Sequence, residues 1–265
     1  LLIALFAQGH CLFVGVPGLA KTLRVQTTAE ALGLDFGRVQ FTPDLMPGDV
    51  TGSLVYDNRT SEFSFRAGPV FTNLLLADEI NRTPPKTQAS LLEVMEEGQV
   101  TVDGQPRPLP DPFLVAATQN PIEMEGTYPL PEAQLDRFLI TTGIGYPPEE
   151  MEKKIIQTGS IREGIREIKP LISREELLRA RQAIRDEVQL SEKITEYIYR
   201  LVVATREHPM LLAGISTRGA ISLADTARSH AFLAGRDHVI PEDVKALYLP
   251  VCAHRLILRP ENETL

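Results

Sequence analysis

The sequence contains no tryptophan, only two cysteines and only five histidines among its 265 residues. Cys11 and Cys252 lie near opposite ends of the chain, so they form neither a disulfide framework nor a pair at metal-ligand spacing. No two histidines have the HxxxH or HExxH spacing, which argues against a zinc site built from protein side chains alone. These absences favour a reducing, cytoplasmic environment.

Positive charge and long hydrophobic runs are also scarce. Lys and Arg total 27 against 35 for Asp and Glu, giving a net charge of −8. Such a chain gains little from counterion release, so we expect no general nucleic-acid binding, although a local basic patch could exist. The longest apolar runs fall far short of the about 20 residues that a bilayer span needs. The opening LLIALF has no basic leader or cleavage site, and we interpret it as the end of an amphipathic helix.

Through about residue 147, short apolar runs alternate with segments of helical spacing. Helices are predicted at 21–32, followed by Gly33, and at 84–97, which has proline near its start and Gly98 after its end. Buried strands are predicted at 11–16, 38–42, 73–78, 113–120 and 138–144. Strands that alternate with helices predict an α/β fold with a five-stranded parallel sheet covered on both faces.

Two segments interrupt this alternation with patterns typical of β-hairpins. Residues 52–68 alternate apolar and polar side chains around a DNRT turn, and residues 98–110 do the same around Asp103-Gly104. Both segments are too short to be domains, so we expect them to project from the α/β core.

Beyond residue 147 the pattern is helical. Ser173 and Glu176 fit a capping box that opens a helix to about residue 187, and Ser191 can cap the next helix. Further helices are predicted at 217–234 and from Pro241 onward. We therefore predict two domains, an α/β core at 1–147 and a smaller all-helical domain at 148–265.

A candidate phosphate-binding loop lies between the first predicted strand and helix. Backbone N–H groups of such a loop bind phosphate at a helix N-terminus, Lys21 would reach the β- and γ-phosphates, and the Thr22 hydroxyl would bind Mg²⁺. The general pattern has glycine where Ala20 stands, and the alternative is an ordinary strand-to-helix turn with a surface lysine. The predicted nucleotide-binding residues here are Gly15, Val16, Pro17, Gly18, Leu19, Ala20, Lys21, Thr22 and Leu23.

Polar residues follow the next buried strands. At the carboxyl edge of a parallel sheet, Asp78 can hold Mg²⁺ and Glu79 can act as the general base toward water. Asn120 ends another strand and could orient that water, or it could simply cap the strand. Arg137 could supply charge to a neighbouring subunit's site, or could form a surface salt bridge; Arg218 opens a helix with no partner that the sequence identifies.

Taken together, these motifs resemble the MoxR family of AAA+ ATPases from about Ala4 to Leu258. The resemblance rests on GVPGLAKT, FTPDLMPGDVTG, LLLADEINRTPPKTQASLLEVMEE, ATQNPIEMEGTYPLPEAQLDRF and the STRG…GRDHVIPEDV tail. It explains Ala20, because the family loop has alanine there. It also implies that the hairpins are the insertions of the helix-2-insert clade, which includes magnesium-chelatase ATPase subunits.

The resemblance implies roles as well as a fold. It implies a P-loop ATPase core with a C-terminal helical lid, a sensor asparagine at Asn120, an arginine finger acting in trans at Arg137 and a second sensor at Arg218. It also implies a homo-oligomeric ring, usually a hexamer, that uses Mg²⁺ and ATP to remodel or insert metal into a client protein. A von Willebrand factor A-domain protein is a common partner in this family, and the N-terminus of the family usually extends further.

Three alternative functions stand beside that of an ATP-driven motor. A nucleotide-gated assembly scaffold would use the same residues with slow, regulatory hydrolysis. A DNA motor is disfavoured because the basic residues of the two hairpins, Arg59, Arg66 and Arg107, are balanced by acidic ones. A GTPase is least favoured, since no Asn-Lys-x-Asp motif follows the loop.

Overall fold

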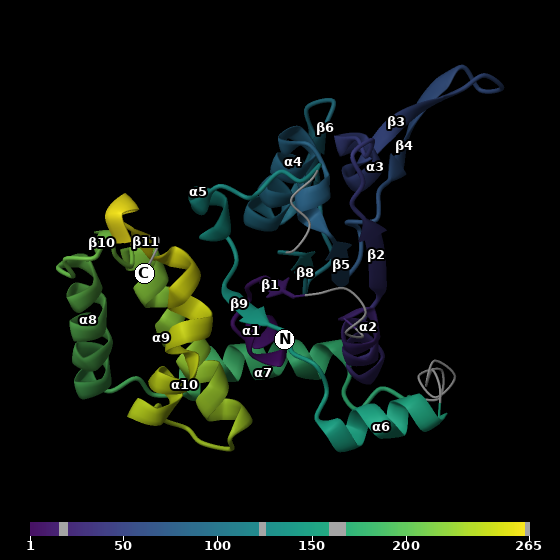
Figure 1. Ribbon diagram of the computed structural model, residues 1–265. Coiled ribbons are helices and arrows are strands. Elements are labelled where there is room, and N and C mark those ends of the chain that lie inside the picture. The colour runs from purple at the N-terminus through teal and green to yellow at the C-terminus, as the bar shows by residue number, and fades with distance from the viewer. Residues whose placement is uncertain (16–20, 122–125, 159–167, 263–265) are drawn as a thin grey trace. The chain divides into compact units, whose positions relative to one another are not determined.

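The computed structural model describes residues 1–15, 21–121, 126–158 and 168–262. The chain forms two compact units. The sheet unit comprises residues 12–129 and 142–174, and the helical unit comprises residues 1–11, 130–141 and 175–265. Each unit has its own buried core, and each is described by itself below (Figure 1).

The predicted five-stranded sheet is confirmed. Its strands are β2 (Phe36–Gln40), β5 (Leu74–Asp78), β8 (Leu114–Gln119), β1 (Cys11–Val14) and β9 (Ile140–Gly143), in that spatial order. β5 pairs in parallel with both β2 and β8. Residues 74–77 have no exposed surface, which explains why this strand is an unbroken apolar run. The second strand was predicted at 38–42 but begins at Phe36, because Gly37 still pairs with Leu75.

The sheet unit also contains helices. They are α2 (Lys21–Ala31), α3 (Pro47–Thr51), the 3₁₀ turn η1 (Ile80–Arg82), α4 (Pro85–Glu97) and α6 (Glu149–Thr158). α2 packs against β2 and β5, and α3 packs against α4. α4 ends where Gly98 adopts φ 64°, a left-handed conformation that glycine takes without steric cost, as the sequence pattern predicts.

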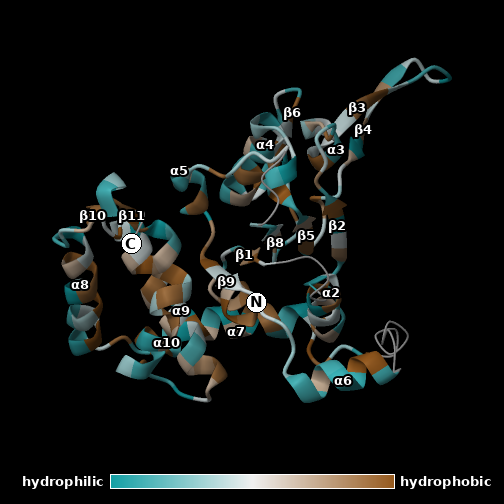
Figure 2. Cartoon of the chain, viewed as in Figure 1, coloured by the Kyte–Doolittle hydropathy of each residue, from teal (hydrophilic) through white to brown (hydrophobic). Residues whose placement is uncertain are grey.

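Both predicted hairpins are present. β3 (Gly52–Asp57) pairs antiparallel with β4 (Glu62–Ala67), and β6 (Gln99–Val102) pairs with β7 (Gln105–Pro108). The first hairpin projects from the sheet unit, and its far end is hydrophilic (Figures 1 and 2). Arg107 of the second hairpin lies 4.1 Å from the ring centre of Phe65 in the first, so the two hairpins contact each other.

The helical unit is built around α9. Its elements are α1 (Leu2–Phe6), α5 (Glu132–Leu135), α7 (Arg174–Glu187), α8 (Glu192–Arg206), β10 (Leu211–Ala213), α9 (Thr217–Leu233), α10 (Pro241–Cys252), η3 (Ala253–Arg255), β11 (Ile257–Leu258) and η4 (Pro260–Asn262). α9 packs against α1, α8 and α10. The hydroxyls of Ser191 and Ser216 accept N–H bonds at the starts of α8 and α9. β10 and β11 form a short antiparallel pair in this otherwise helical region.

Candidate active site

The phosphate-binding loop begins where β1 ends. The Gly15 N–H donates to the Gln119 carbonyl over 3.1 Å, which joins the end of β1 to the end of β8. A Cβ atom at Gly15 would lie 2.9 Å from the Ile144 carbonyl oxygen, so this close approach requires glycine. The predicted binding residues Val16, Pro17, Gly18, Leu19 and Ala20 lie outside the described residues.

α2 begins at Lys21, with Thr22 and Leu23 half-buried in its first turn. The Lys21 ammonium donates to the Gly15 carbonyl over 2.7 Å, across the two ends of the loop. Burial lowers the pKa of Lys21, while the charges of Asp78 and Glu79 oppose that shift. The predicted phosphate-binding cation is therefore close enough to Asp78, the predicted Mg²⁺ ligand, and to Glu79, the predicted general base, to interact with their charges.

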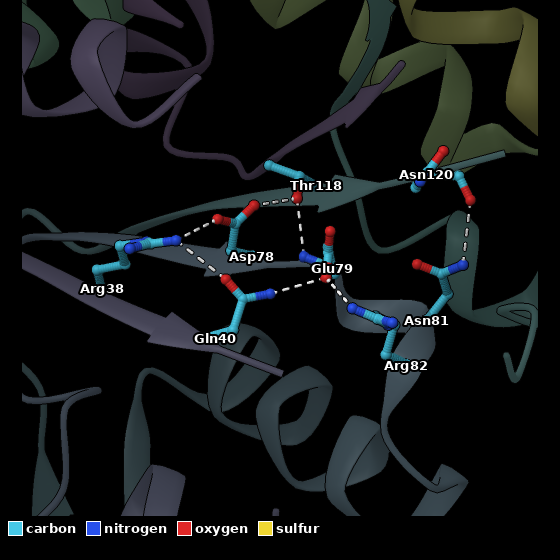
Figure 3. Close-up of polar contacts among 8 residues, drawn as sticks. All are labelled: Arg38, Gln40, Asp78, Glu79, Asn81, Arg82, Thr118 and Asn120. Atoms are coloured by element: carbon cyan, nitrogen blue, oxygen red, sulfur yellow. Dashed lines mark hydrogen bonds and ion pairs between the residues drawn. The ribbon is translucent and has the colours of Figure 1, made fainter. Parts of the chain in front are cut away.

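Asp78 ends β5 in a defined polar environment (Figure 3). Its Oδ1 accepts a 2.7 Å hydrogen bond from the Thr118 hydroxyl, and its Oδ2 forms a 2.8 Å ion pair with the Arg38 guanidinium. The Arg38 side chain is 47% exposed, so this pair contributes at most about 1 kcal/mol and Arg38 can be displaced at little cost. The buried Thr118 bond is the stronger constraint on the carboxylate.

Glu79 has a left-handed backbone conformation, with φ 56° and ψ 52°. This conformation is uncommon for a residue other than glycine and is concentrated at functional sites. Its N–H donates to the Thr118 hydroxyl over 2.8 Å. Its Oε2 accepts bonds from Gln40, over 2.8 Å, and from Arg82, over 2.9 Å. The predicted general base is therefore held at both backbone and side chain.

Asn120 follows β8 and is 6% exposed. Its carbonyl accepts a 3.3 Å bond from the amide of Asn81, which is itself buried in η1. Within the described part of the chain, the Asn81 side-chain oxygen has no hydrogen-bond partner. Since β8 lies between β5 and β1, Asn120 is placed between the ends of the strands that carry Asp78 and Gly15.

Sequence reasoning missed the residues that hold these acids. Arg38 and Gln40 lie two apart on β2, so they point to the same face, and the register pairs Gln40 with Asp78. Thr118 is a buried polar residue that directly follows the apolar run 114–117 of β8. Alternating polar residues on a sheet strand, and one polar residue within a buried run, are the signals that could have found them.

Arg137 and Arg218 belong to the helical unit. Arg137 is half-buried just after α5, and Arg218 is exposed in the first turn of α9. The sheet unit by itself therefore contains Lys21, Asp78, Glu79 and Asn120, and these four are gathered at one edge of the sheet.

The donor set fits Mg²⁺ bound together with a nucleotide. Mg²⁺ takes oxygen ligands, usually one or two protein oxygens with substrate phosphates and water. Asp78 offers a carboxylate oriented by Thr118, and Thr22 offers a hydroxyl next to Lys21. Among the described residues, no group of three His, Cys, Asp or Glu side chains could hold a metal unaided, and no helix is long and apolar enough to cross a membrane.

Comparison with known proteins shows which families and relatives this chain resembles. Residues 10–140 match the family model described as the ATPase family associated with various cellular activities, and residues 203–264 match the AAA lid domain. The chain is 48% identical to the uncharacterized protein YeaC of Bacillus subtilis, covering 98% of this chain and 81% of that one. It is 45% identical to chaperone MoxR1 of Mycobacterium tuberculosis, covering 97% and 70%.

A solved structure shares the fold. The crystal structure of a provisionally assigned ATPase from Cytophaga hutchinsonii superposes with a TM-score of 0.92 and 45% sequence identity. The match covers 99% of this chain and 82% of that one. At this identity and coverage, the likeness extends over both the sheet unit and the helical unit.

Proposed function

The chain belongs to the MoxR family of AAA+ ATPases, and from this premise we propose that it hydrolyses ATP with Mg²⁺ to remodel a client protein complex. Chaperone-like remodelling, maturation and metal insertion are the forms of this activity that the resemblance implies. The observation that carries the proposal is the Thr118 hydroxyl, which joins the Asp78 carboxylate to the Glu79 backbone beside Lys21. The proposal includes the two predicted domains, a nucleotide-binding α/β core at 1–147 and a helical lid at 148–265.

In the proposed reaction, water attacks the γ-phosphorus of ATP while the bond from that phosphorus to the bridging oxygen of ADP breaks. The Glu79 carboxylate accepts the proton of the water, and Asn120 orients the water. Lys21 and the N–H groups of the loop bind the phosphates. Thr22 and Asp78 would hold Mg²⁺, which neutralises phosphate charge when it is bound. Arg218 would sense the γ-phosphate from the lid.

The proposed motor is a homo-oligomeric ring, with a hexamer expected. Within the sheet unit, Arg38 and Arg82 pair with Asp78 and Glu79, and the proposal assigns neither of them to the phosphates. Arg137 of a neighbouring subunit would then stabilise the transition state. A von Willebrand factor A-domain partner, a client protein and a cytoplasmic location complete the proposal, and we expect neither nucleic acid nor a membrane span.

A nucleotide-gated scaffold with slow hydrolysis is the second candidate. The observation in its favour is that Gln40 and Arg82 both donate to the Glu79 oxygen that would accept the proton. A carboxylate oxygen that already accepts two hydrogen bonds has no lone pair left for the proton of water until one of the donors moves away. The two candidates differ in whether a client or partner raises the hydrolysis rate substantially.

Glu79→Gln tests the proposed reaction. We expect turnover to fall by at least about 10²-fold, because the amide cannot accept the proton, while ATP binding is retained. Glu93→Gln, an exposed glutamate on α4, is the matched control and should hydrolyse ATP as the unmodified protein does. Steady-state phosphate release and equilibrium binding of a labelled ATP analogue measure the two properties. Turnover retained in Glu79→Gln would reject the role of this residue.

A further inference from the structure

Arg255 is buried within the helical unit, and the mechanism proposed above gives it no role. It ends η3, directly after α10, and its side chain is 3% exposed. A buried arginine remains charged, so its burial is stable only where hydrogen bonds and an opposite charge compensate for lost water. Its partners therefore show what this cation stabilises.

The guanidinium binds the segment that carries Arg137. Its Nε donates to the Asp136 carboxylate over 2.7 Å, and its Nη2 donates to the Phe138 carbonyl over 2.9 Å. Longer bonds of 3.3 Å reach the carbonyls of Asp136 and Leu139. These acceptors lie on both sides of Arg137, so the backbone of that residue is held before and after its Cα atom.

The neighbouring His254 supports the same segment. Its Nε2 lies 2.9 Å from the Phe138 carbonyl, which requires the tautomer with the proton on Nε2. Burial, followed by the charge of Arg255, lowers the pKa of His254 to about 4, so the ring is neutral near pH 7. Arg255 thus contacts the segment around Arg137 as a cation, and His254 contacts it as a neutral donor.

The stem of Arg255 contacts the helix that carries Arg218. A Cβ atom on Gly219 would lie 3.1 Å from the Arg255 Cδ, so the absence of a side chain lets the arginine pack against the first turn of α9. Gly219 directly follows Arg218, and the Gly219 N–H is capped by Ser216. One side chain therefore touches both the Arg137 segment and the start of the Arg218 helix.

We propose that Arg255 is a positioning residue that fixes Arg137, and with it the start of α9, as one rigid piece that each subunit presents to its neighbour. The inference rests on the proposed function, since it takes Arg137 to act in trans. The proposal predicts that Arg137 moves together with α9 and α10 when these helices change position. The nucleotide state sensed by the lid of one subunit would then reach the site of the next subunit.

Arg255→Met tests the proposal, because methionine fills much of the stem volume but donates no hydrogen bond. We expect kcat for ATP to fall as far as it does in Arg137→Ala, with ATP affinity and oligomeric state unchanged. Arg259→Met, at an exposed arginine four residues further on, is the matched control and should keep the full rate. If Arg255→Met does not fold, Asp136→Asn takes its place, because it removes the charged acceptor and keeps the shape.

Subunit mixing separates a finger defect from general damage. Glu79→Gln subunits have an inactive site but an intact finger, so rings co-assembled from equal amounts of Glu79→Gln and Arg255→Met should recover up to about a quarter of the full rate. Recovery supports the proposal. Absence of recovery, or a full rate in Arg255→Met alone, overturns it.

The same mixing with Arg137→Ala tests the proposed function independently. If Arg137→Ala with Glu79→Gln recovers activity while Arg255→Met with Glu79→Gln does not, Arg137 acts in trans and the role of Arg255 is wrong. If Arg137→Ala keeps the full rate or is not rescued, the trans finger itself is rejected, and the inference falls with it.

Discussion

Thr118 is the residue at which a small change should have the largest effect on the proposed site. Its hydroxyl is buried, donates to Asp78 over 2.7 Å and accepts from the Glu79 N–H over 2.8 Å. Thr118→Val keeps the shape of the side chain and removes both bonds. Comparing Thr118→Val with the unmodified protein therefore measures the effect of the hydroxyl while the packing of β8 is unchanged.

The expected cost follows from these two bonds. An orphaned backbone N–H costs about 1–3 kcal/mol, and a lost bond to a carboxylate costs about 1.5–3 kcal/mol. Because Asp78 keeps its pair with Arg38 and Glu79 is partly exposed, we expect a net loss near 3 kcal/mol. Removing a partner that orients a metal ligand typically weakens metal binding or activity by about 10–100-fold, and we expect that loss in the apparent Mg²⁺ affinity.

Urea unfolding and ATPase rates measured against Mg²⁺ concentration check both values. Thr118→Ser keeps the hydroxyl and should behave like the unmodified protein, and Thr101→Val makes the same change at an exposed strand position. The reasoning is refuted if Thr118→Val matches Thr101→Val in both its unfolding midpoint and its Mg²⁺ dependence.

Two further predictions concern a titration and a close contact. The lowered pKa of His254, about 4, means that the unfolded chain binds this proton more readily, so stability should fall by about 3 kcal/mol as pH drops from 6.5 to 4. The glutamine amide of His254→Gln can still donate to the Phe138 carbonyl but does not titrate. The urea unfolding midpoint of this variant should therefore change less between pH 6.5 and pH 4 than that of the unmodified protein. Gly15→Ala would place a Cβ atom 2.9 Å from the Ile144 carbonyl, and we expect weaker ATP binding in calorimetry, whereas Gly145→Ala, with open space around it, should bind normally.

Much of the site could be predicted because its signals are local. The apolar run 74–77 followed by Asp78 and Glu79 indicates a buried strand that ends in acids, and a strand, loop and helix around Lys21 indicate a phosphate site. Hydrophobic periodicity and turn chemistry act over a few residues, so one sequence is enough to predict these features. Both hairpins were predictable for the same reason, from alternation around a short polar turn.

What the sequence alone determined was the type of each element and the residues that end it; tertiary structure decided which of them meet. Periodicity shows which face of a strand is buried but not which strand lies beside it, so the bonds of Thr118 to Asp78 and of Gln40 to Glu79 needed the order β2-β5-β8. The contact of Arg255 with Asp136 spans 119 positions, and no local pattern marks it. Such contacts form because a buried charge must find its partners wherever the folded chain brings them.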